Sequence, residues 1–274
     1  MSKPLFSCVV PVKGPRPYLD EALASLSAQG MGDDLEVIVQ DGGGKFENRG
    51  LRIENGRWVC EEDCGQSDAL NRGFAKAKGE WFFWLNSDDL LLSGVLERVK
   101  AKIEALAKTG KHVEWIVGNQ LRIDADGRVV DCSVGNGWHD CLYRHAVPHV
   151  YGPSSFFRRE LFERTGGFDV SLHICMDWDM WIRFMRSGAR FHRIGAYLWA
   201  QRQWSGSKTQ RKMGREELNV HQEEVARMLA KNDFRITHGG VWLSRLWRTL
   251  NGNYFAEWRD GMRMRGRKAL ECAD

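Results

Sequence analysis

The chain has 274 residues, of which 43% are hydrophobic and 28% are charged, and its net charge is +4. This composition excludes a disordered or collagen-like chain, and so small a net charge does not indicate a nucleic-acid-binding protein. No apolar run reaches the roughly 18 residues of a membrane-spanning helix, and the first four residues lack the apolar stretch of a signal peptide. We therefore expect a cytosolic globular protein with reduced cysteines.

The first half of the chain alternates apolar runs, which predict buried strands, with segments that have apolar residues at helical spacing. In chain order the expected elements are a strand at 6–12, a helix at 16–29, a strand at 35–40, a helix at 67–76, a strand at 81–85 and a helix at 95–109. This alternation predicts an α/β fold, Rossmann-like, with a mostly parallel central sheet and flanking helices. Ligand sites in such sheets lie beyond the carboxyl ends of the strands.

The second half is more mixed. Two short apolar runs flank Asp126 and Gly127, and this pattern predicts a hairpin. The later expected elements are helices at 160–165 and 178–187, an extended segment at 191–203, and basic helical segments after Lys208. The last 74 residues contain fifteen Lys and Arg against nine Asp and Glu, so the positive charge is concentrated there.

The first candidate site follows the strand at 35–40, where Asp41 precedes Gly42. An acid followed by glycine at a strand end allows a ligand to approach the backbone closely, although a solvated turn is an open alternative. The glycines do not match the dinucleotide-binding motif, and no P-loop motif occurs in the chain.

A stronger candidate follows the strand at 81–85, where the chain continues Asn86-Ser87-Asp88-Asp89. Oxygen-bearing side chains at one strand end can hold a hard divalent cation and leave positions for phosphate oxygens. A turn in which these side chains cap the next helix is the alternative.

Two further Asp-x-Asp patterns need comparison with this one. Asp124 and Asp126 lie in the predicted hairpin, so we interpret them as turn residues. Asp177 and Asp179 open a predicted helix, where acids are favoured by the helix dipole, so capping is an alternative to catalysis.

Four segments in order resemble glycosyltransferase family 2, which has the GT-A fold, and in particular its bacterial polysaccharide and lipopolysaccharide branch. They are residues 6–13, 37–43, 64–89 and 166–183. The resemblance covers about 5–209. It implies a GT-A domain over 1–209, with a donor half at about 1–118 and an acceptor half at about 119–209, followed by a helical basic extension at 210–274.

The resemblance also implies a nucleoside-diphosphate sugar (UDP, GDP or dTDP) as donor, with Mg²⁺ or Mn²⁺ as cofactor. Asp88 corresponds to the metal-binding carboxylate of the family's Asp-x-Asp motif, in which Asn86 replaces the first acid. Asp41 and Asp68 would contact the base or ribose, and Arg72 would lie near the diphosphate. The donor-binding residues implied are Pro11, Asp41, Gly42, Asp68, Arg72, Asn86, Ser87 and Asp88.

On the acceptor side the resemblance assigns Asp177 as the catalytic base, with a saccharide or lipid-linked saccharide as acceptor. This chain has Met176 where a Glu often precedes the base, and Trp204 where many relatives have a histidine. Arg202 and Lys208 could neutralise phosphate instead or could be solvated. Four tryptophans near this region could stack on sugar rings or pack in the core, namely Trp178, Trp181, Trp199 and Trp204.

The extension contains two apolar groups at helical spacing. The apolar residues of the first group, from Trp242 to Leu250, fall within roughly 140° of a helical wheel, and Arg245 and Arg248 project from the opposite side. A second group over 254–262 is followed by several basic residues. This pattern predicts an interfacial helix over 240–268 on anionic lipid at the inner face of the membrane. The alternative is that the apolar face packs on the catalytic domain or on a partner subunit. The sequence therefore leaves an oligomer possible.

The sequence therefore favours an inverting glycosyltransferase over two rivals. A sugar-phosphate nucleotidyltransferase would need a glycine-rich basic loop after the first strand, where this chain has Pro15 and Pro17. A carbohydrate-binding or scaffolding relative without catalysis is suggested by Asn86, Met176 and Trp204, and opposed by Asp88 and Asp177.

Overall fold

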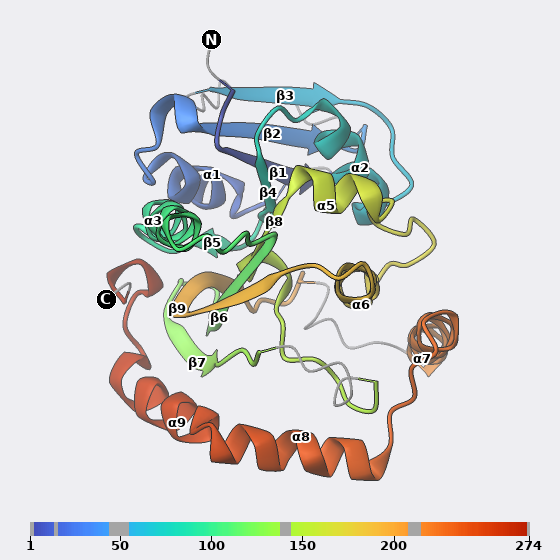
Figure 1. The fold of residues 1–274 in the computed structure, drawn as a ribbon. Helices are drawn as coiled ribbons and strands as arrows, with labels where there is room; N and C mark the ends of the chain where they lie inside the picture. Colours follow the sequence, from blue (N-terminus) through green and yellow to red (C-terminus); the bar gives the residue numbers. More distant parts are fainter. Residues whose placement is uncertain (1–2, 14–15, 44–54, 138–143, 208–214, 273–274) are drawn as a thin grey trace.

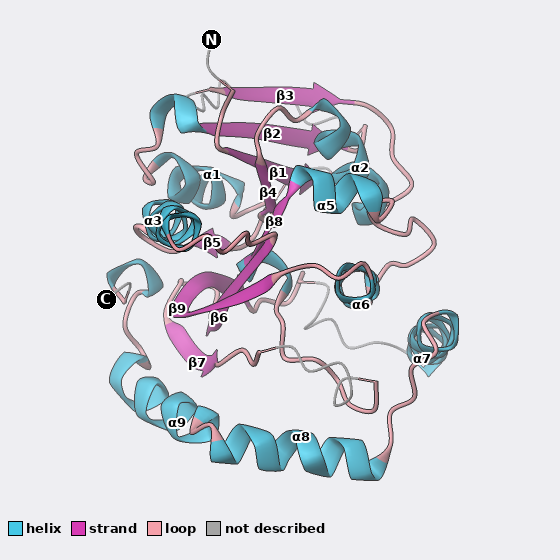
Figure 2. Ribbon diagram, in the orientation of Figure 1, coloured by secondary structure: helices cyan, strands magenta, loops and turns pink. Residues whose placement is uncertain are grey.

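The computed structural model describes residues 3–13, 16–43, 55–137, 144–207 and 215–272, with the side chains of 215–218 left out. A single sheet forms the centre of the molecule, and helices lie on both of its faces (Figures 1 and 2). The strands are β1 (Phe6–Val12), β2 (Leu35–Asp41), β3 (Gly56–Cys60), β4 (Trp81–Trp84), β5 (Leu90–Leu91), β6 (Trp115–Ile123), β7 (Val129–Ser133), β8 (Ser155–Arg158) and β9 (Phe191–Arg202). The helices are α1 (Leu19–Ser27), α2 (Gln66–Lys76), α3 (Val95–Lys108), α5 (Arg159–Arg164), α6 (Met176–Arg186), α7 (Arg215–Lys231), α8 (His238–Leu250) and α9 (Asn253–Met264).

The sheet has the strand order β3-β2-β1-β4-β8-β6-β9-β5, with β7 paired to β6. Strands β3, β2, β1 and β4 are parallel, and so are β6 and β9, whereas β8, β5 and β7 are antiparallel to their neighbours. This confirms the predicted α/β architecture with a mostly parallel sheet and flanking helices. Because β4 pairs with β8 and β5 pairs with β9, the segments on either side of residue 118 share one hydrogen-bonded sheet.

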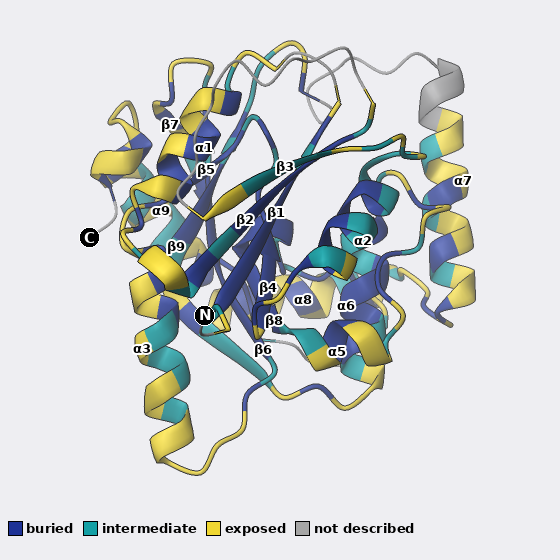
Figure 3. Ribbon diagram, turned by 90° about the horizontal axis from the view of Figure 1, so that it is seen from above, coloured by how far each residue is buried: buried dark blue, intermediate teal, exposed yellow. Residues whose placement is uncertain are grey.

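The core lies on both faces of this sheet, and Figure 3 shows the central strands buried along their length. Along β1, Cys8 and Val10 face the cluster under α1 and α3, while Val9 faces the cluster under α2 and α6. This alternation is what the period of two in a strand dictates. The second cluster is aromatic: the ring of Trp181 stacks on Trp84 at 5.9 Å and on Trp115 at 4.9 Å between centroids. Trp181 is therefore a core residue.

The expected elements are all present, with shifted ends. The first helix begins at Leu19 instead of residue 16, because Arg16 precedes Pro17 and a residue before proline is disfavoured in the helical region. The helix expected at 178 begins at Met176, which places Asp177 in its first turn. The hairpin around Asp126 is confirmed, since the carboxylate of Asp124 accepts from the backbone N–H groups of Asp126 and Arg128 at 3.0 and 2.8 Å.

The C-terminal extension is attached to this hairpin. The backbone N–H of Val129 donates to Arg267 O, and that of Gly266 donates to Val129 O, both at 2.8 Å. The N–H of Ala269 donates to Gly127 O at 3.0 Å. Helices α8 and α9 lie end to end along the side of the molecule that carries β7, at the far side of the molecule from β3 (Figure 1). Among the helices of the described segments, none combines the length and the hydropathy needed to cross a bilayer.

Helix α8 turns some of its polar residues toward the protein and its large apolar residues outward. Ser244 and Arg248 are buried, and Arg248 donates to Val134 O at 2.9 Å. Trp242 and Leu250, in contrast, are 61% and 74% exposed. The alternative that this apolar group packs on the catalytic domain is therefore wrong.

Candidate active site

A cavity of about 1060 Å³ lies beyond the carboxyl ends of β1 and β4, next to the first turn of α6. The sequence-predicted residues that line it are Pro11, Asn86, Ser87, Asp88 and Asp177. The cavity lies where sites of such sheets are expected, beyond the carboxyl ends of the strands. Its lining brings together the predicted metal-binding acid, Asp88, and the predicted base, Asp177.

The other four predicted donor residues lie outside the cavity lining. Asp41 ends β2 and is fully buried, and Gly42 follows it. Asp68 accepts from the backbone N–H of Cys64 and from Arg72 Nε, both at 3.0 Å. The N–H of Cys64 and the charge of Arg72 lower the pKa of Asp68, so this acid is held as a carboxylate at the start of α2. A donor role for these four residues stays a prediction.

Gly42 lies beside Asp63, a residue that lines the cavity. A Cβ atom at this position would overlap the carboxylate of Asp63, which lines the cavity and accepts from the N–H of Gly65 at 2.9 Å. A side chain at this position would displace the carboxylate of Asp63 from where it lies in the cavity.

The loop after β4 is organised by side-chain hydrogen bonds. Asn86 accepts from Gln66 Nε2 at 2.9 Å and donates to Asp89 Oδ2 at 2.7 Å. Asp89 is buried and also accepts from the N–H of Arg202 at 2.9 Å. Burial and, after it, the charge of Asp88 raise the pKa of Asp89 well above its usual range. Asn86 and the buried Asp89 thus serve to position this loop.

Arg202 fixes the same loop from β9. Its side chain is 1% exposed and donates to Asp88 O at 3.0 Å and to Glu21 Oε2 at 2.7 Å. It also donates to Ala125 O at 2.7 Å and lies over the ring of Tyr18 at 4.2 Å. Through these contacts the guanidinium of Arg202 holds the loop after β4. The interpretation that Arg202 is solvated is therefore wrong. Lys208, the other basic candidate, lies outside the described residues.

Trp204 contacts the predicted metal-binding acid directly. Its indole Nε1–H donates to Asp88 Oδ2 at 2.9 Å, and its ring meets Tyr18 edge-on at 5.4 Å. The sequence identified Trp204 as a departure from the histidine of many relatives and as one of four tryptophans that could stack on sugar rings or pack in the core. A contact across 116 positions of the chain has no local signal, so the sequence could not predict it.

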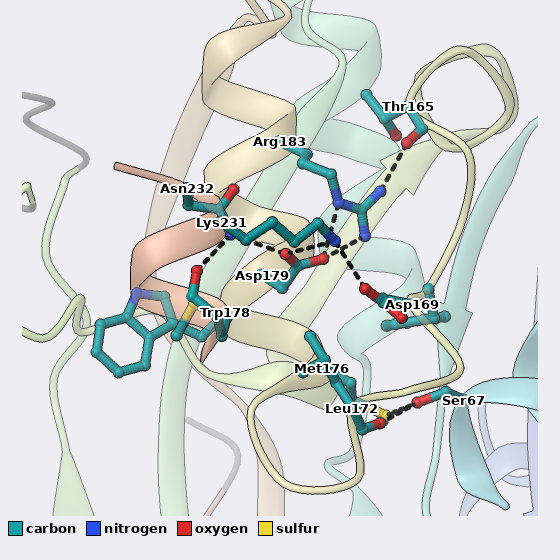
Figure 4. A network of polar contacts seen from close by, with 12 residues as sticks. Ser67, Thr165, Asp169, Leu172, Met176, Trp178, Asp179, Arg183, Lys231 and Asn232 are labelled. Atoms are coloured by element: carbon teal, nitrogen blue, oxygen red, sulfur yellow. Dashed lines mark hydrogen bonds and ion pairs between the residues drawn. The ribbon is translucent and has the colours of Figure 1, made fainter. Parts of the chain in front are cut away.

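The two acids at the start of α6 have different surroundings. Asp177 lines the cavity, and its Oδ1 accepts from the N–H of Trp178 at 2.8 Å. Asp179 is fully buried and accepts from Arg183 Nε at 2.8 Å and from Asn232 Nδ2 at 2.9 Å. Figure 4 shows Asp179 enclosed by Arg183, Lys231 and Asn232. Asp179 therefore ties α6 to α7, and Asp177 is the acid of this pair that lines the cavity.

Glu224 on α7 holds the segment that precedes Asp177. Its buried carboxylate accepts from the N–H groups of Ile174 and Cys175 at 2.6 and 3.0 Å. Burial acts to raise the pKa of Glu224, but the backbone donors outweigh it and the pKa is lowered. A charge from α7 thus satisfies the donors at the start of α6, where a helix has N–H groups without helical partners.

The cavity contains ionisable residues that the sequence did not single out. Lys13 and Arg16 lie beside the end of β1, and His173 precedes α6. His221 belongs to α7, so the extension contributes to the lining. No motif marks these positions, because they come together only through the fold. Of the other histidines, His145 does not line the cavity, and its Nδ1 lies 3.3 Å from Arg235 O. His139 lies outside the described residues.

Comparison with known proteins identifies the family of this chain. The sequence profile of Glycosyl transferase family 2 matches residues 7–166, a span that includes β1, the loop after β4 and β8. The chain belongs to glycosyltransferase family 2. Its expected membership is confirmed.

Curated relatives of this chain include an uncharacterised glycosyltransferase of Rickettsia prowazekii, which is 30% identical over 193 residues, or 67% of this chain and 59% of that protein. A PGL/p-HBAD biosynthesis glycosyltransferase of Mycobacterium bovis is 29% identical over 198 residues, covering 67% of this chain and 70% of the relative. The match thus spans about three-fifths of the length of the Rickettsia prowazekii relative.

Solved structures show the same fold. Staphylococcus aureus TarS 1–349, in complex with UDP-GlcNAc, has a TM-score of 0.62 at 18% identity and covers 83% of this chain and 66% of its own. The mannosyltransferase PcManGT of Pyrobaculum calidifontis, in complex with GDP-Man and Mn²⁺, has a TM-score of 0.56 at 20% identity and covers 84% of this chain and 63% of its own. The GT-A fold expected from the sequence is confirmed.

Proposed function

We propose that this chain is an inverting glycosyltransferase. It transfers a sugar from a nucleoside-diphosphate sugar (UDP, GDP or dTDP) to a hydroxyl of a saccharide or a lipid-linked saccharide. The observation that carries this proposal is that Asp88 and Asp177, from two different elements, line one cavity. A metal-assisted leaving group and an acceptor hydroxyl must meet in the same space for direct transfer.

The residues present suit a metal that is completed by substrate. Within the described ranges no group of three or more His, Cys, Asp and Glu is arranged to hold a metal ion. Mg²⁺ is commonly held by one or two carboxylates together with substrate phosphates, so a single carboxylate at Asp88 fits Mg²⁺ or Mn²⁺ bound with the donor. Such an ion would act as a Lewis acid that stabilises the leaving diphosphate. The complexes of TarS with UDP-GlcNAc and of PcManGT with GDP-Man and Mn²⁺ support this choice.

The protein's own groups supply the remaining chemistry. Asp177 accepts the proton of the acceptor hydroxyl as the oxygen attacks the anomeric carbon and the bond to the diphosphate breaks. The attack comes from the face opposite the leaving group, so the configuration inverts. The N–H of Trp178 orients the carboxylate of Asp177. Lys13 and Arg16 place positive charge in the cavity, where it attracts the diphosphate.

A nucleotide-sugar-binding relative with weakened catalysis is the second candidate. Two observations favour it: the indole of Trp204 occupies an oxygen of Asp88, and Asn86 is engaged by Gln66 and Asp89. This candidate predicts donor binding without turnover.

The test begins with the full chain and a panel of UDP-, GDP- and dTDP-sugars, screened by thermal shift with and without Mn²⁺. A donor at a hundredfold excess over its Kd should stabilise the protein by about 2.7 kcal/mol. Release of nucleoside diphosphate from the stabilising donor, with water as the acceptor, then separates the enzyme from the binding relative. If no sugar nucleotide stabilises the protein, both candidates fail.

A further inference from the structure

Helices α8 and α9 expose nine large apolar side chains, which we call the apolar strip. These side chains are 38–74% exposed, and four of the nine are Trp or Tyr. The apolar strip consists of Trp242, Leu243, Leu246, Trp247, Leu250, Tyr254, Phe255, Trp258 and Met262.

The inward faces of the same helices carry polar residues that make specific contacts, beside the buried Met264 of α9. Arg248 is 3% exposed, donates to Val134 O and pairs with Glu257 at 2.5 Å. Asn253 is buried, and its side-chain amide contacts Asn136. Rolling the helices to bury the apolar strip would leave these polar groups without partners in a buried place, which is costly. The outward orientation of the strip is therefore built into the packing.

Both ends of the helix pair are fixed to the rest of the molecule. Near the start of α8, Gly240 lies so close to the backbone of His145 that a Cβ atom would overlap it. After α9, the chain pairs with the hairpin through Gly266, Arg267 and Ala269. The apolar strip is thus held along one side of the molecule rather than on a loose tail (Figure 1).

A continuous exposed apolar surface of this kind marks an interaction site. The residues around it indicate the partner. Tryptophan and tyrosine are favoured at the boundary between lipid headgroups and acyl chains. Residues 238–268 contain seven Lys and Arg against two Asp and Glu, and Arg245, Arg259 and Arg263 are exposed on the two helices. Apolar and aromatic residues beside arginines complement an anionic bilayer.

We propose that the apolar strip docks this protein on the surface of an anionic lipid bilayer. The strip lies in the interface, parallel to the membrane, and the neighbouring arginines contact the lipid phosphates. This proposal does not depend on catalysis, so it can fail while the proposed glycosyl transfer stands, and the reverse also holds.

The experiment is co-sedimentation of the full chain with vesicles of pure phosphatidylcholine or of equal parts phosphatidylcholine and phosphatidylglycerol. We expect binding to the second and a partition coefficient that falls as salt is raised, because salt screens the arginines. Quenching of tryptophan fluorescence by brominated lipid should accompany binding, since Trp242, Trp247 and Trp258 would enter the interface.

Point variants test the strip itself; a truncation would also remove the segment that pairs with β7. The variant W242Q/L250Q/W258Q/M262Q should lose binding by at least ~10-fold, because its apolar contribution is largely removed. R245E/R263E should lose at least ~10-fold on anionic vesicles, since each cation near such a surface contributes about fivefold. The control V147Q/V170Q changes two exposed apolar residues outside the strip and should bind as the unmodified protein does. Thermal unfolding confirms that each variant is folded.

Three results would overturn the proposal. The first is that the folded, unmodified chain fails to bind anionic vesicles. The second is that the fourfold variant binds as well as the control. The third is a concentration-dependent dimer, seen by light scattering without vesicles, that the fourfold variant abolishes while vesicles stay unbound; a second copy would then cover the strip.

Discussion

The carboxylate of Asp88 is held from two directions. Its Oδ2 accepts the indole N–H of Trp204, and its backbone carbonyl accepts the guanidinium of Arg202. The neighbouring Asp89 is kept away from solvent and has a raised pKa. Asp88 is therefore the acid of the loop that we expect to hold the metal.

The first prediction concerns this charge. Asp88→Ala should abolish the Mn²⁺-dependent part of nucleoside diphosphate binding, because no other carboxylate of the loop is suited to replace it. Calorimetry with UDP or GDP, with and without Mn²⁺, measures the effect. Asp126→Ala, from the Asp-x-Asp of the hairpin, is the matched control and should leave binding unchanged. If Asp88→Ala binds normally, the metal lies elsewhere.

The second prediction separates the two acids of α6. Asp177→Asn should keep donor affinity and lose transfer by at least ~10²-fold, since the amide is close in shape but does not take the proton. Asp179→Asn should instead lower the free energy of unfolding, because it weakens a buried ion pair with Arg183. Rates measured per folded molecule check both variants. Normal transfer by Asp177→Asn together with lost transfer by Asp179→Asn would show that the wrong acid was chosen.

At the scale of single residues, the sequence predicted those site residues that belong to a recognisable motif. Asp88 follows an expected strand and Asp177 lies at the start of an expected helix, and both line the cavity. The partners of Asp88, which are Arg202 and Trp204, lie more than a hundred positions away, so only the fold reveals them. The ionisable residue that α7 adds to the cavity, His221, belongs to a segment that no motif covers.

Helix α7 joins the extension to the catalytic site. It contacts α6 through Glu224 at the start of that helix and through Asn232 and Lys231 at Asp179. The position of Asp177 depends on the first of these contacts, because the chain reaches Asp177 directly after the residues that Glu224 holds.

The third prediction tests this contact. Glu224→Ala should lower the free energy of unfolding by about 1–3 kcal/mol, because it leaves buried N–H groups without an acceptor. Glu224→Gln should restore part of the stability, since its amide oxygen can accept the same hydrogen bonds. Urea unfolding measures both. Equal stability of Glu224→Ala and the unmodified protein would show that α6 does not need this cap.

The fourth prediction concerns the segment after β9. Trp204→Phe keeps a ring beside Tyr18 but removes the N–H that occupies Asp88 Oδ2. The metal-dependent affinity for nucleoside diphosphate should therefore rise several-fold, since a hydrogen bond is worth on the order of 1 kcal/mol. Titration with Mn²⁺ at fixed UDP or GDP measures the change, and Trp258→Phe on α9 is the control. A fall in affinity would show that the indole assists the bound state instead.

Across the whole molecule, one sheet connects the strands of the first half of the chain to those of the second half, and the extension packs against the β6–β7 hairpin. Elements with a strong period were predicted within a few residues. The short strands β3, β5 and β8 were not, because their pairing with distant strands, and not a local pattern, defines them. The outward face of α8 was also not determined by its pattern, since periodicity identifies an apolar face but not what lies against it.

The fifth prediction links acid sensitivity to the contact of α8 with the domain. Burial, and then the charge of Arg248, lower the pKa of His149 to about 4. In the unfolded chain the pKa is near ~6.5, so the unfolded state takes up the proton first as the pH falls. The contribution to stability is complete above about pH 6.5 and is lost toward pH 4. Between pH 7.5 and 5 the free energy of unfolding should fall by on the order of 1–2 kcal/mol from this residue.

Urea unfolding at both pH values checks this expectation. His149→Gln, which cannot take up the proton, should reduce the loss on acidification, whereas His112→Gln, at an exposed position, should leave it intact. An identical loss in all three proteins would assign the acid sensitivity to other groups.

The attachment of α8 and α9 at both ends has a consequence for acceptor choice. Because both ends of the helix pair are attached to the rest of the molecule, a protein that rests on a surface through these helices would hold its cavity at a set position relative to that surface. Asp177 would then stay at one height above that surface, and this height would set the distance from the surface at which the proposed transfer takes place. An acceptor anchored in the same surface would be selected by how far its hydroxyl extends, so sugars added too near or too far from the anchor would be passed over.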